Sequence, residues 1–305
     1  MGLGLQSLDS NPILQSHPRL TFQKFGYTYL VETKDNRSTY SVSDGTRTVT
    51  LPIKWSFGNG AQTWVFERDG IYYESLVSYY PSVSGLAITI GDFEITPRTL
   101  DEAVGRRLPP NEPVACFGCH ATNAVRETQL TLGSLTPGVG CEHCHVGTSS
   151  HLIAAAQGEG AETAPPNLRK LSSEDLLDFC GQCHRNWETV IRGPWRGELT
   201  VRFQPYRLAI SKCFSGTDPR ISCIACHDPH KDLVTEDAAY DGKCLACHAL
   251  KGASVVTTKT AAKACPVQKN NCTSCHMPEV KLASGQVTFH DHRIRIVKAG
   301  ASYPD

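Results

Sequence analysis

Apolar and polar side chains alternate along the first hundred residues of this 305-residue chain. Tyr27, Tyr29 and Val31 occupy every second position, and the run 49–57 is apolar at each odd-numbered residue. This period of two is typical of a strand with one buried face. Hairpin turns are expected at Asp44-Gly45, Gly58-Asn59-Gly60 and Asp69-Gly70. We therefore predict a small antiparallel β module over residues 1–105.

The pattern changes after the Pro-rich junction at residues 109–113. Residues 157–166 are rich in Gly, Ala and Pro and predict a loop. The segment from Ser172 to Cys180 predicts a short helix capped by its serine. The fold class expected is α+β and irregular: the β module is followed by a loop-rich domain with short helices over residues 106–305.

One five-residue pattern, CxxCH, occurs six times in this second part. It is the attachment signature of c-type haem, in which both thiols become thioethers and the histidine is the proximal iron ligand. The sequence thus predicts six haem c groups. The cysteine pairs are Cys116 and Cys119, Cys141 and Cys144, Cys180 and Cys183, Cys223 and Cys226, Cys244 and Cys247, and Cys272 and Cys275. The proximal histidines are His120, His145, His184, His227, His248 and His276.

Structural zinc is the main alternative, because CxxC pairs also bind zinc. Zinc gives no reason for a histidine directly after every second cysteine, and all six pairs have one. A thioredoxin-like site needs one pair, and a disulfide scaffold is a much shorter chain. The pattern favours haem.

The number of remaining histidines equals the number of predicted irons. The chain has 12 histidines and only two methionines, and Met277 is poorly placed because it directly follows a proximal histidine. Two histidines on each iron would fill its coordination sphere and favour electron transfer at low potential. The candidate distal ligands are His151, His230, His292, His290, His143 and His17.

Sequence position separates these candidates. His151 and His230 lie close to attachment motifs, and the alternative for each is a contact with a haem propionate or with solvent. His290 and His292 share one face of a predicted strand, where one of them could instead bind a propionate.

The other two candidates, His143 and His17, have less direct routes to an iron. His143 lies inside its own CxxCH and can reach only a neighbouring haem, whereas His17 lies far from the motifs and an exposed surface position is its alternative. Cys213 and Cys265 remain outside the motifs and are candidates for a disulfide, the alternative being two separate thiols.

The charge balance gives no sign of nucleic-acid binding, since Lys plus Arg and Asp plus Glu are 30 each. Ionised propionates on six haems would add a charge of about −12, which favours basic redox partners. Arg202, Arg207 and Lys212 are candidates for pairing with propionates, or form a solvated face. No apolar stretch reaches the length of a transmembrane span.

Several segments together resemble the bacterial periplasmic multihaem c-type cytochromes. They are residues 55–81, CFGCHATNAV at 116–125, GVGCEHCH at 138–145, RFQPYRL at 202–208, SCIACHDPH at 222–230, and CTSCHMP with the later DHRIRI at 272–296. The resemblance implies distal roles for His151 and His230. It also implies a signal peptide and a further CxxCH upstream, so that the start is misplaced and a seventh haem, another candidate iron for His17, is missing.

Haem c is attached outside the cytoplasmic membrane, so we expect a periplasmic or extracellular protein whose leader was removed or omitted. The sequence favours an electron carrier with redox partner proteins over an enzyme. One alternative is an oxidoreductase of the nitrite or hydroxylamine type with one open haem. Another is a subunit of a polymeric haem wire or of a membrane-associated complex.

Overall fold

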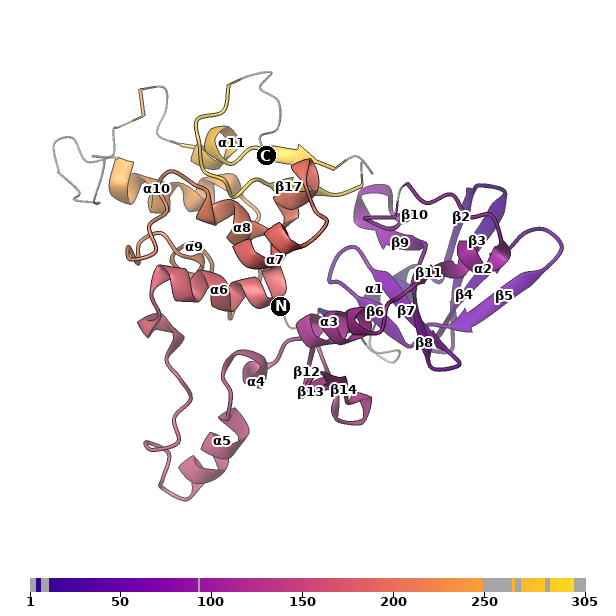
Figure 1. The fold of residues 1–305 in the computed structure, drawn as a ribbon, viewed down its shortest axis with the longest axis horizontal. Coiled ribbons are helices and arrows are strands. Elements are labelled where there is room, and N and C mark those ends of the chain that lie inside the picture. The colour runs from indigo at the N-terminus through magenta and orange to yellow at the C-terminus, as the bar shows by residue number, and fades with distance from the viewer. Residues whose placement is uncertain are drawn as a thin grey trace. The chain divides into compact units, whose positions relative to one another are not determined.

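The computed structural model describes residues 4–6, 11–92, 94–248, 265–266, 270–282 and 286–298. The chain separates into two compact units, Met1–Pro166 and Asn167–Asp305. The predicted α+β class is confirmed, because antiparallel sheets come first and a loop-rich part with short helices follows (Figure 1). The predicted boundary at residue 105 marks where the cysteine-containing part begins, and it stays a prediction.

A four-stranded antiparallel sheet in the order β2-β3-β4-β5 begins the first unit. Tyr29 pairs with Val42, and Val31 pairs with Tyr40, so aromatic and β-branched side chains face each other across β3 and β4. All four side chains are fully buried. The strands are β2 (Arg19–Lys24), β3 (Tyr27–Lys34), β4 (Arg37–Ser43) and β5 (Thr48–Pro52).

A second sheet has the order β1-β6-β7-β8-β11, and β9 pairs separately with β10. The run of alternating residues 49–57 spans both sheets: it forms β5, leaves its sheet at Pro52, buries Ile53 and continues as β6. The strands are β1 (Leu5–Gln6), β6 (Trp55–Phe57), β7 (Thr63–Arg68), β8 (Ile71–Ser75), β9 (Val77–Tyr80), β10 (Gly85–Ile88) and β11 (Gly105–Arg107).

The three predicted hairpin turns are confirmed, since Asp44-Gly45 joins β4 to β5, Gly58–Gly60 lies between β6 and β7, and Asp69-Gly70 joins β7 to β8. Short helices and strands complete this unit. They are α1 (Pro12–Ser16), η2 (Pro81–Val83), α2 (Leu100–Val104), α3 (Asn111–His120), β12 (Ala121–Thr122), β13 (Val125–Arg126), β14 (Gln129–Leu130), η3 (Leu132–Ser134), β15 (Thr136–Pro137), α4 (Cys141–Cys144) and α5 (Thr148–Ala156).

The core of the first unit consists of apolar side chains from the sheets. One cluster surrounds Trp64 and Tyr40, and a second surrounds Phe117 of α3. Phe117 is fully buried and makes edge contacts with Trp55 and Phe57, at 5.2 and 5.1 Å between ring centres. The helix that carries the first CxxCH motif is therefore packed directly onto the five-stranded sheet.

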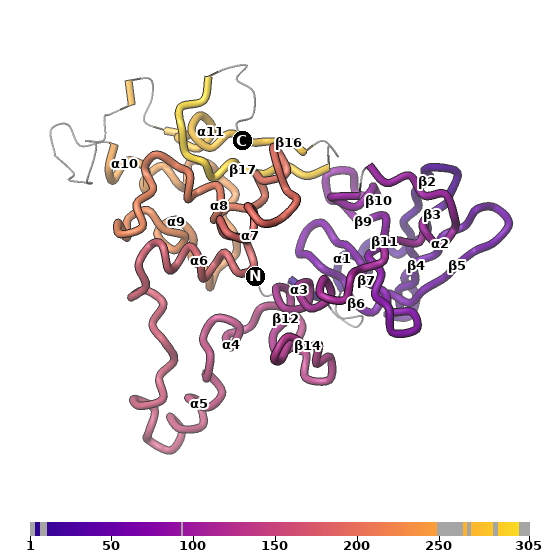
Figure 2. Tube along the Cα trace, viewed as in Figure 1, coloured from indigo at the N-terminus to yellow at the C-terminus, as the bar shows by residue number. Residues whose placement is uncertain are grey.

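The second unit consists of short helices connected by loops (Figure 2). The predicted helix after Ser172 is confirmed: α6 spans Ser173–His184, and the Ser172 hydroxyl accepts the Asp175 N–H at 3.1 Å. The other elements are η4 (Leu168–Lys170), α7 (Trp187–Arg192), η5 (Gly197–Arg202), α8 (Gln204–Ala209), α9 (Cys223–Cys226), η6 (Asp237–Tyr240), α10 (Asp241–His248), α11 (Cys272–His276), β16 (Glu279–Lys281) and β17 (Thr288–His290).

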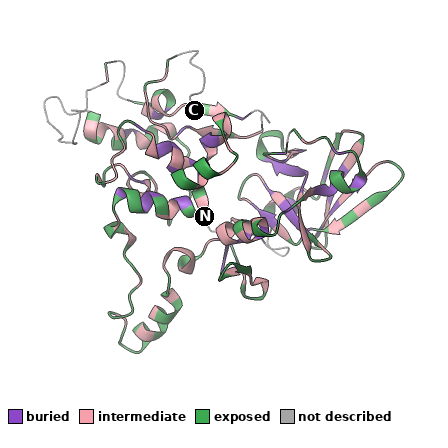
Figure 3. Ribbon diagram, in the orientation of Figure 1, coloured by how far each residue is buried: buried purple, intermediate pink, exposed green. Residues whose placement is uncertain are grey.

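Few apolar side chains are buried in the described part of this second unit (Figure 3). Cys180, Cys223 and Cys244 are half-buried, and Cys226 and Cys275 are exposed. The buried apolar residues there are Leu176, Leu177, Val190, Val201, Phe203, Leu208 and Leu282. The helices that carry motifs are thus held by few core contacts of their own.

Candidate functional site

All six CxxCH motifs fold in the same way, with both cysteines on a helix. They lie on α3, α4, α6, α9, α10 and α11. Residues three apart in a helix are neighbours on one face, so each helix presents its two thiols side by side. This is the arrangement needed to attach both sides of one porphyrin.

Two of the predicted proximal histidines donate hydrogen bonds from their Nδ1 atoms. His120 donates to the Gly4 carbonyl and His276 to the Arg295 carbonyl, each at 2.9 Å. A carbonyl oxygen can only accept, so the proton is on Nδ1 and the lone pair is on Nε2. Such bonds orient metal-binding imidazoles and raise their basicity. These residues therefore fit the role of a haem ligand.

His227 is held by the hydroxyl of Tyr240, at 3.4 Å from its Nδ1. That hydroxyl donates to the Val234 carbonyl at 2.7 Å, so it accepts from the imidazole. Burial lowers the pKa of His227 and of His120, which favours the neutral form that binds iron.

Cysteines of different motifs contact each other in the second unit. Cys180 and Cys223 interact through their side chains, as do Cys244 and Cys272. Asp241 at the start of α10 accepts the backbone N–H of Cys272 at 2.8 Å. The third and fourth motifs are therefore neighbours, as are the fifth and sixth.

The imidazole of His292 lies close to that of His227. Their ring centres are 6.1 Å apart and their planes are inclined by 35°. The Nδ1 of His292 donates to the His290 carbonyl at 3.0 Å, which leaves the Nε2 lone pair available. Burial lowers the pKa of His292 to about 4, so this imidazole is neutral.

His290 has a different environment, although both histidines were predicted on one face of a strand. Its Nδ1 donates to the Met277 carbonyl at 3.0 Å. Its Nε2 lies 3.5 Å from the Asp237 carboxylate and 3.6 Å from that of Glu279. The two imidazoles thus face different neighbours.

His143 contacts the first motif by hydrogen-bonding to the backbone of Ala121, the residue after His120. A distal role for His143 at a haem other than its own stays a prediction. His151 lies on α5 with its Nδ1 3.4 Å from the Thr163 hydroxyl. His230 is exposed in the turn after α9, with its Nδ1 3.4 Å from Asp228.

Both ring nitrogens of His17 have partners within the β-rich part of the first unit, which runs from β1 to β11 and ends at Arg107. Its Nδ1 is 3.0 Å from the Ile13 carbonyl, and its Nε2 is 3.3 Å from the Tyr79 hydroxyl. The ring also packs on Tyr79, with centres 4.9 Å apart. These contacts give His17 a structural role at the end of α1.

Cys213 is exposed and Cys265 is half-buried. Within the described residues, neither cysteine is part of a disulfide. Although Cys213 is exposed as a residue, partial desolvation of its thiol, followed by the neighbouring Cys244, Cys226 and Cys247, raises its pKa, so this thiol lies close to the fourth and fifth motifs. The disulfide between Cys213 and Cys265 stays a prediction.

The sequence alone did not indicate a charged cluster beside the first motif. The guanidinium of Arg106 lies 2.7 Å from Glu74, 2.8 Å from Glu112 on α3 and 3.6 Å from the buried Asp92. Burial, with help from Glu74, raises the pKa of Asp92 to about 7. Burial, followed by the nearby Glu74 and Glu112, raises the pKa of Cys116 to about 12.

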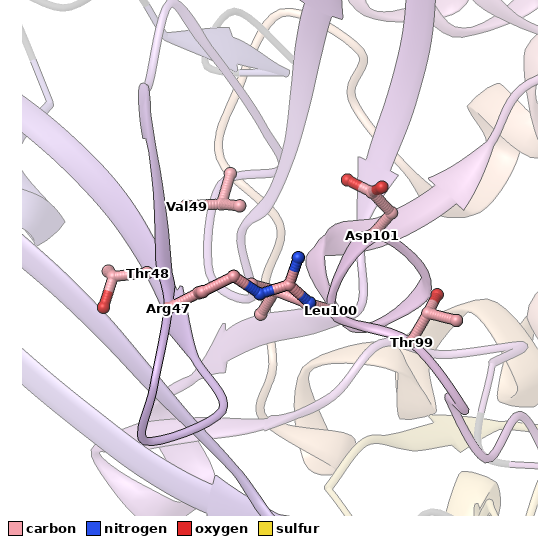
Figure 4. A pocket seen from close by; sticks show the side chains of 6 residues that line it. All are labelled: Arg47, Thr48, Val49, Thr99, Leu100 and Asp101. Carbon is pink, nitrogen blue, oxygen red and sulfur yellow. The ribbon is translucent and has the colours of Figure 1, made fainter.

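A surface pocket of about 400 Å³ lies in the β-rich part, apart from the motifs (Figure 4). No cysteine or histidine lines it, so it does not extend the candidate site. Its lining residues are Arg47, Thr48, Val49, Thr99, Leu100 and Asp101.

Within the described ranges, no three His, Cys, Asp or Glu side chains converge where they could hold a metal ion. Structural zinc takes four such ligands, whereas haem iron takes at most two from the protein. In the same ranges, no helix has the length and apolar character of a membrane span.

A family model described as Cytochrome c554 and c-prime matches residues 100–146. The matched segment contains α3 with the first CxxCH and α4 with the second. The match supports a c-type cytochrome, a protein that binds haem and takes part in electron transport. No curated protein and no solved structure matches the chain.

Proposed function

We propose that this chain is a multihaem c-type cytochrome that passes single electrons along six covalently bound haems. The observation that carries the proposal is the common geometry of the six motifs, each with two cysteines on one helical turn followed by a histidine. Bound haem supplies an iron that changes oxidation state by one electron. The protein supplies the attachment points and the axial imidazoles.

Electron transfer through the second unit is supported by the contacts between motifs. Cys180 touches Cys223, and Cys244 touches Cys272. The electrostatic influence of Cys244 on Cys226 links these two pairs. Haems attached at these cysteines would be near neighbours, in the order of the third, fourth, fifth and sixth motifs.

The position of His292 supports bis-histidine ligation at the fourth motif. With metal–imidazole bonds of about 2 Å, two imidazoles on opposite sides of one metal have ring centres about 6 Å apart. The ring centres of His227 and His292 are separated by 6.1 Å. We assign His292 as the distal partner of His227, and keep His151, His230, His290 and His143 as candidates for the other irons.

A periplasmic or extracellular location follows from the covalent haems, because their attachment takes place outside the cytoplasmic membrane. Redox proteins with basic surfaces are the partners that a charge of about −12 from ionised propionates would favour.

The test is a haem count combined with spectroscopy of the protein matured with its haems. Intact-mass measurement should give the polypeptide plus six haems. Electron paramagnetic resonance of the oxidised protein should show low-spin iron that does not change with cyanide, nitrite or hydroxylamine. A mass with fewer haems, or with zinc, would contradict the proposal.

His17 favours one alternative, an oxidoreductase with one open haem. Because its Nε2 faces the Tyr79 hydroxyl at 3.3 Å, five spare histidines remain for six irons. An iron without a second histidine would give a high-spin signal that shifts when nitrite or hydroxylamine binds. That result would favour an oxidoreductase with one open haem over an electron carrier.

A further inference from the structure

A buried ion pair joins α8 to the segment that carries His290 and His292. Arg207 and Asp291 are both completely buried, with 0 % of either side chain exposed. The guanidinium donates twice to the carboxylate, from Nε at 2.8 Å and from Nη2 at 3.0 Å. Arg207 is a candidate on sequence grounds for pairing with a haem propionate, but in the structure its guanidinium binds Asp291.

Asp291 also organises its own segment of the chain. Its carboxylate accepts the backbone N–H of Arg293 at 3.0 Å and a further hydrogen bond from the Arg295 side chain. Its backbone N–H donates to the Pro278 carbonyl at 3.0 Å. Three groups besides Arg207 therefore depend on the position of this one residue.

Ser211, which lies two residues after the end of α8, also fixes this segment. Its hydroxyl donates to the His292 carbonyl at 2.9 Å and accepts the Ile294 N–H at 2.9 Å. The backbone on both sides of His292 is thus anchored to one short helix and the residues after it.

The anchored segment in turn orients haem ligands. The His292 imidazole donates to the carbonyl of His290, and the imidazole of the proximal His276 donates to the carbonyl of Arg295. Both acceptors lie within four residues of Asp291. A shift of this segment would move the two imidazoles together.

Stability alone gives little reason for the pair. Desolvating two charges costs several kcal/mol per ion, and well-packed apolar residues in their place are often neutral or stabilising. A bidentate pair does, however, define one geometry where apolar side chains would accept several. Precise placement of attached groups is what such a pair provides.

We propose that Arg207 and Asp291 are positioning residues for axial ligation, holding His292 opposite His227 and His276 in its proximal orientation. The inference rests on the proposed function, since it requires haem at the fourth and sixth motifs. Neither residue touches the iron; both act through the backbone that carries or contacts the imidazoles.

The test replaces the pair in the haem-loaded protein and measures ligation. The double variant Arg207→Met/Asp291→Leu removes both charges of the buried pair together, and Arg295, whose side chain is 15 % exposed, keeps its hydrogen bond to the Arg293 carbonyl, so the fold is expected to persist. We expect one or two of the six haems to change from low spin to high spin and their reduction potentials to shift. Glu188→Gln in the exposed Arg192–Glu188 pair, at 2.7 Å, is the matched control and should leave all spectra unchanged.

Ser211→Ala is a milder variant. It tests whether the anchored segment positions the axial imidazoles if the double variant does not fold. It removes the hydrogen bond to the His292 carbonyl and keeps both charges, and we expect a smaller shift in the signal of a single haem. A wild-type spectrum in either folded variant would overturn the proposal. Failure of the proposed function is recognised separately, because the wild-type protein would then lack six haems or low-spin iron.

Discussion

In the β-rich part, the largest fully buried side chains are aromatic, with Trp64, Tyr29 and Tyr40 at 0 % exposure. In the second unit, the largest fully buried side chain described is that of Arg207, a cation held by Asp291. The first region excludes water with its own apolar residues. The second has few of these and contains four of the six CxxCH motifs.

This difference indicates where each region gains its stability. Apolar burial contributes about 25 cal/mol per Å² and needs no cofactor when side chains provide the surface. Under the proposed function, the porphyrins of the second unit would provide much of that surface themselves. We therefore expect the β-rich part to fold alone and the second unit to depend on haem attachment.

Withholding haem should have the largest effect. In protein produced without haem attachment, residues 167–298 should lose protection almost completely, while residues 11–107 keep it. Limited proteolysis with mass mapping, and hydrogen exchange, measure this directly. Equal protection in the two regions would show that the helices after Asn167 do not need the cofactor.

Truncation of a core residue should affect only the β-rich part. Leu76 is fully buried, so Leu76→Ala should lower the free energy of unfolding by about 2–5 kcal/mol. Leu233, in the second unit, is 71 % exposed. Leu233→Ala should therefore change the free energy of unfolding by less than about 0.5 kcal/mol. Urea unfolding followed by circular dichroism compares the two variants. Similar losses would mean that the contrast in burial does not determine stability.

The pH response should also differ between the regions. The pKa of Asp92 is raised to about 7, so between about pH 4 and 7 the folded state binds a proton that the unfolded state has released. The contribution of Asp92 to the stability of the β-rich part should therefore be most favourable below about pH 4. It should become less favourable as the pH rises to 7.

Asp92→Asn should remove that slope. Thermal melting between pH 4 and 8 measures it, and Asp101→Asn, which alters an exposed carboxylate, is the control. An unchanged slope in the Asp92 variant would mean that Arg106, at 3.6 Å, keeps this carboxylate ionised.

Local signals in the sequence predicted much of the fold. Alternation identified β3, the Asp-Gly and Gly-rich pairs identified the turns, and Ser172 identified the start of α6. Alternation could not show that residues 49–57 divide between two sheets, because the period of two continues through Ile53. The CxxCH pattern is equally local and locates the candidate attachment sites, but it predicted a helix only at the third motif.

Long-range pairs were not predictable in this way. Arg207 and Asp291 are 84 residues apart, and no local pattern around either residue predicts that the two form an ion pair. The approach of His292 to His227 likewise depends on how the loops fold. The sequence therefore provides candidate axial ligands, and the structure is needed to propose which two histidines share an iron.

The smallest effect is expected at the start of α6, in the region with few core contacts. Ser172→Ala removes the hydroxyl that accepts the Asp175 N–H, and such caps contribute about 1 kcal/mol. Ser172→Asn keeps a capping group and should restore the loss. Because this helix is expected to lose its protection when haem is withheld, the effect of the cap should be measurable only in the haem-loaded protein. Hydrogen exchange at Leu176 and Leu177, with and without haem, measures this, and an equal effect in both states would mean that haem adds nothing to the stability of α6.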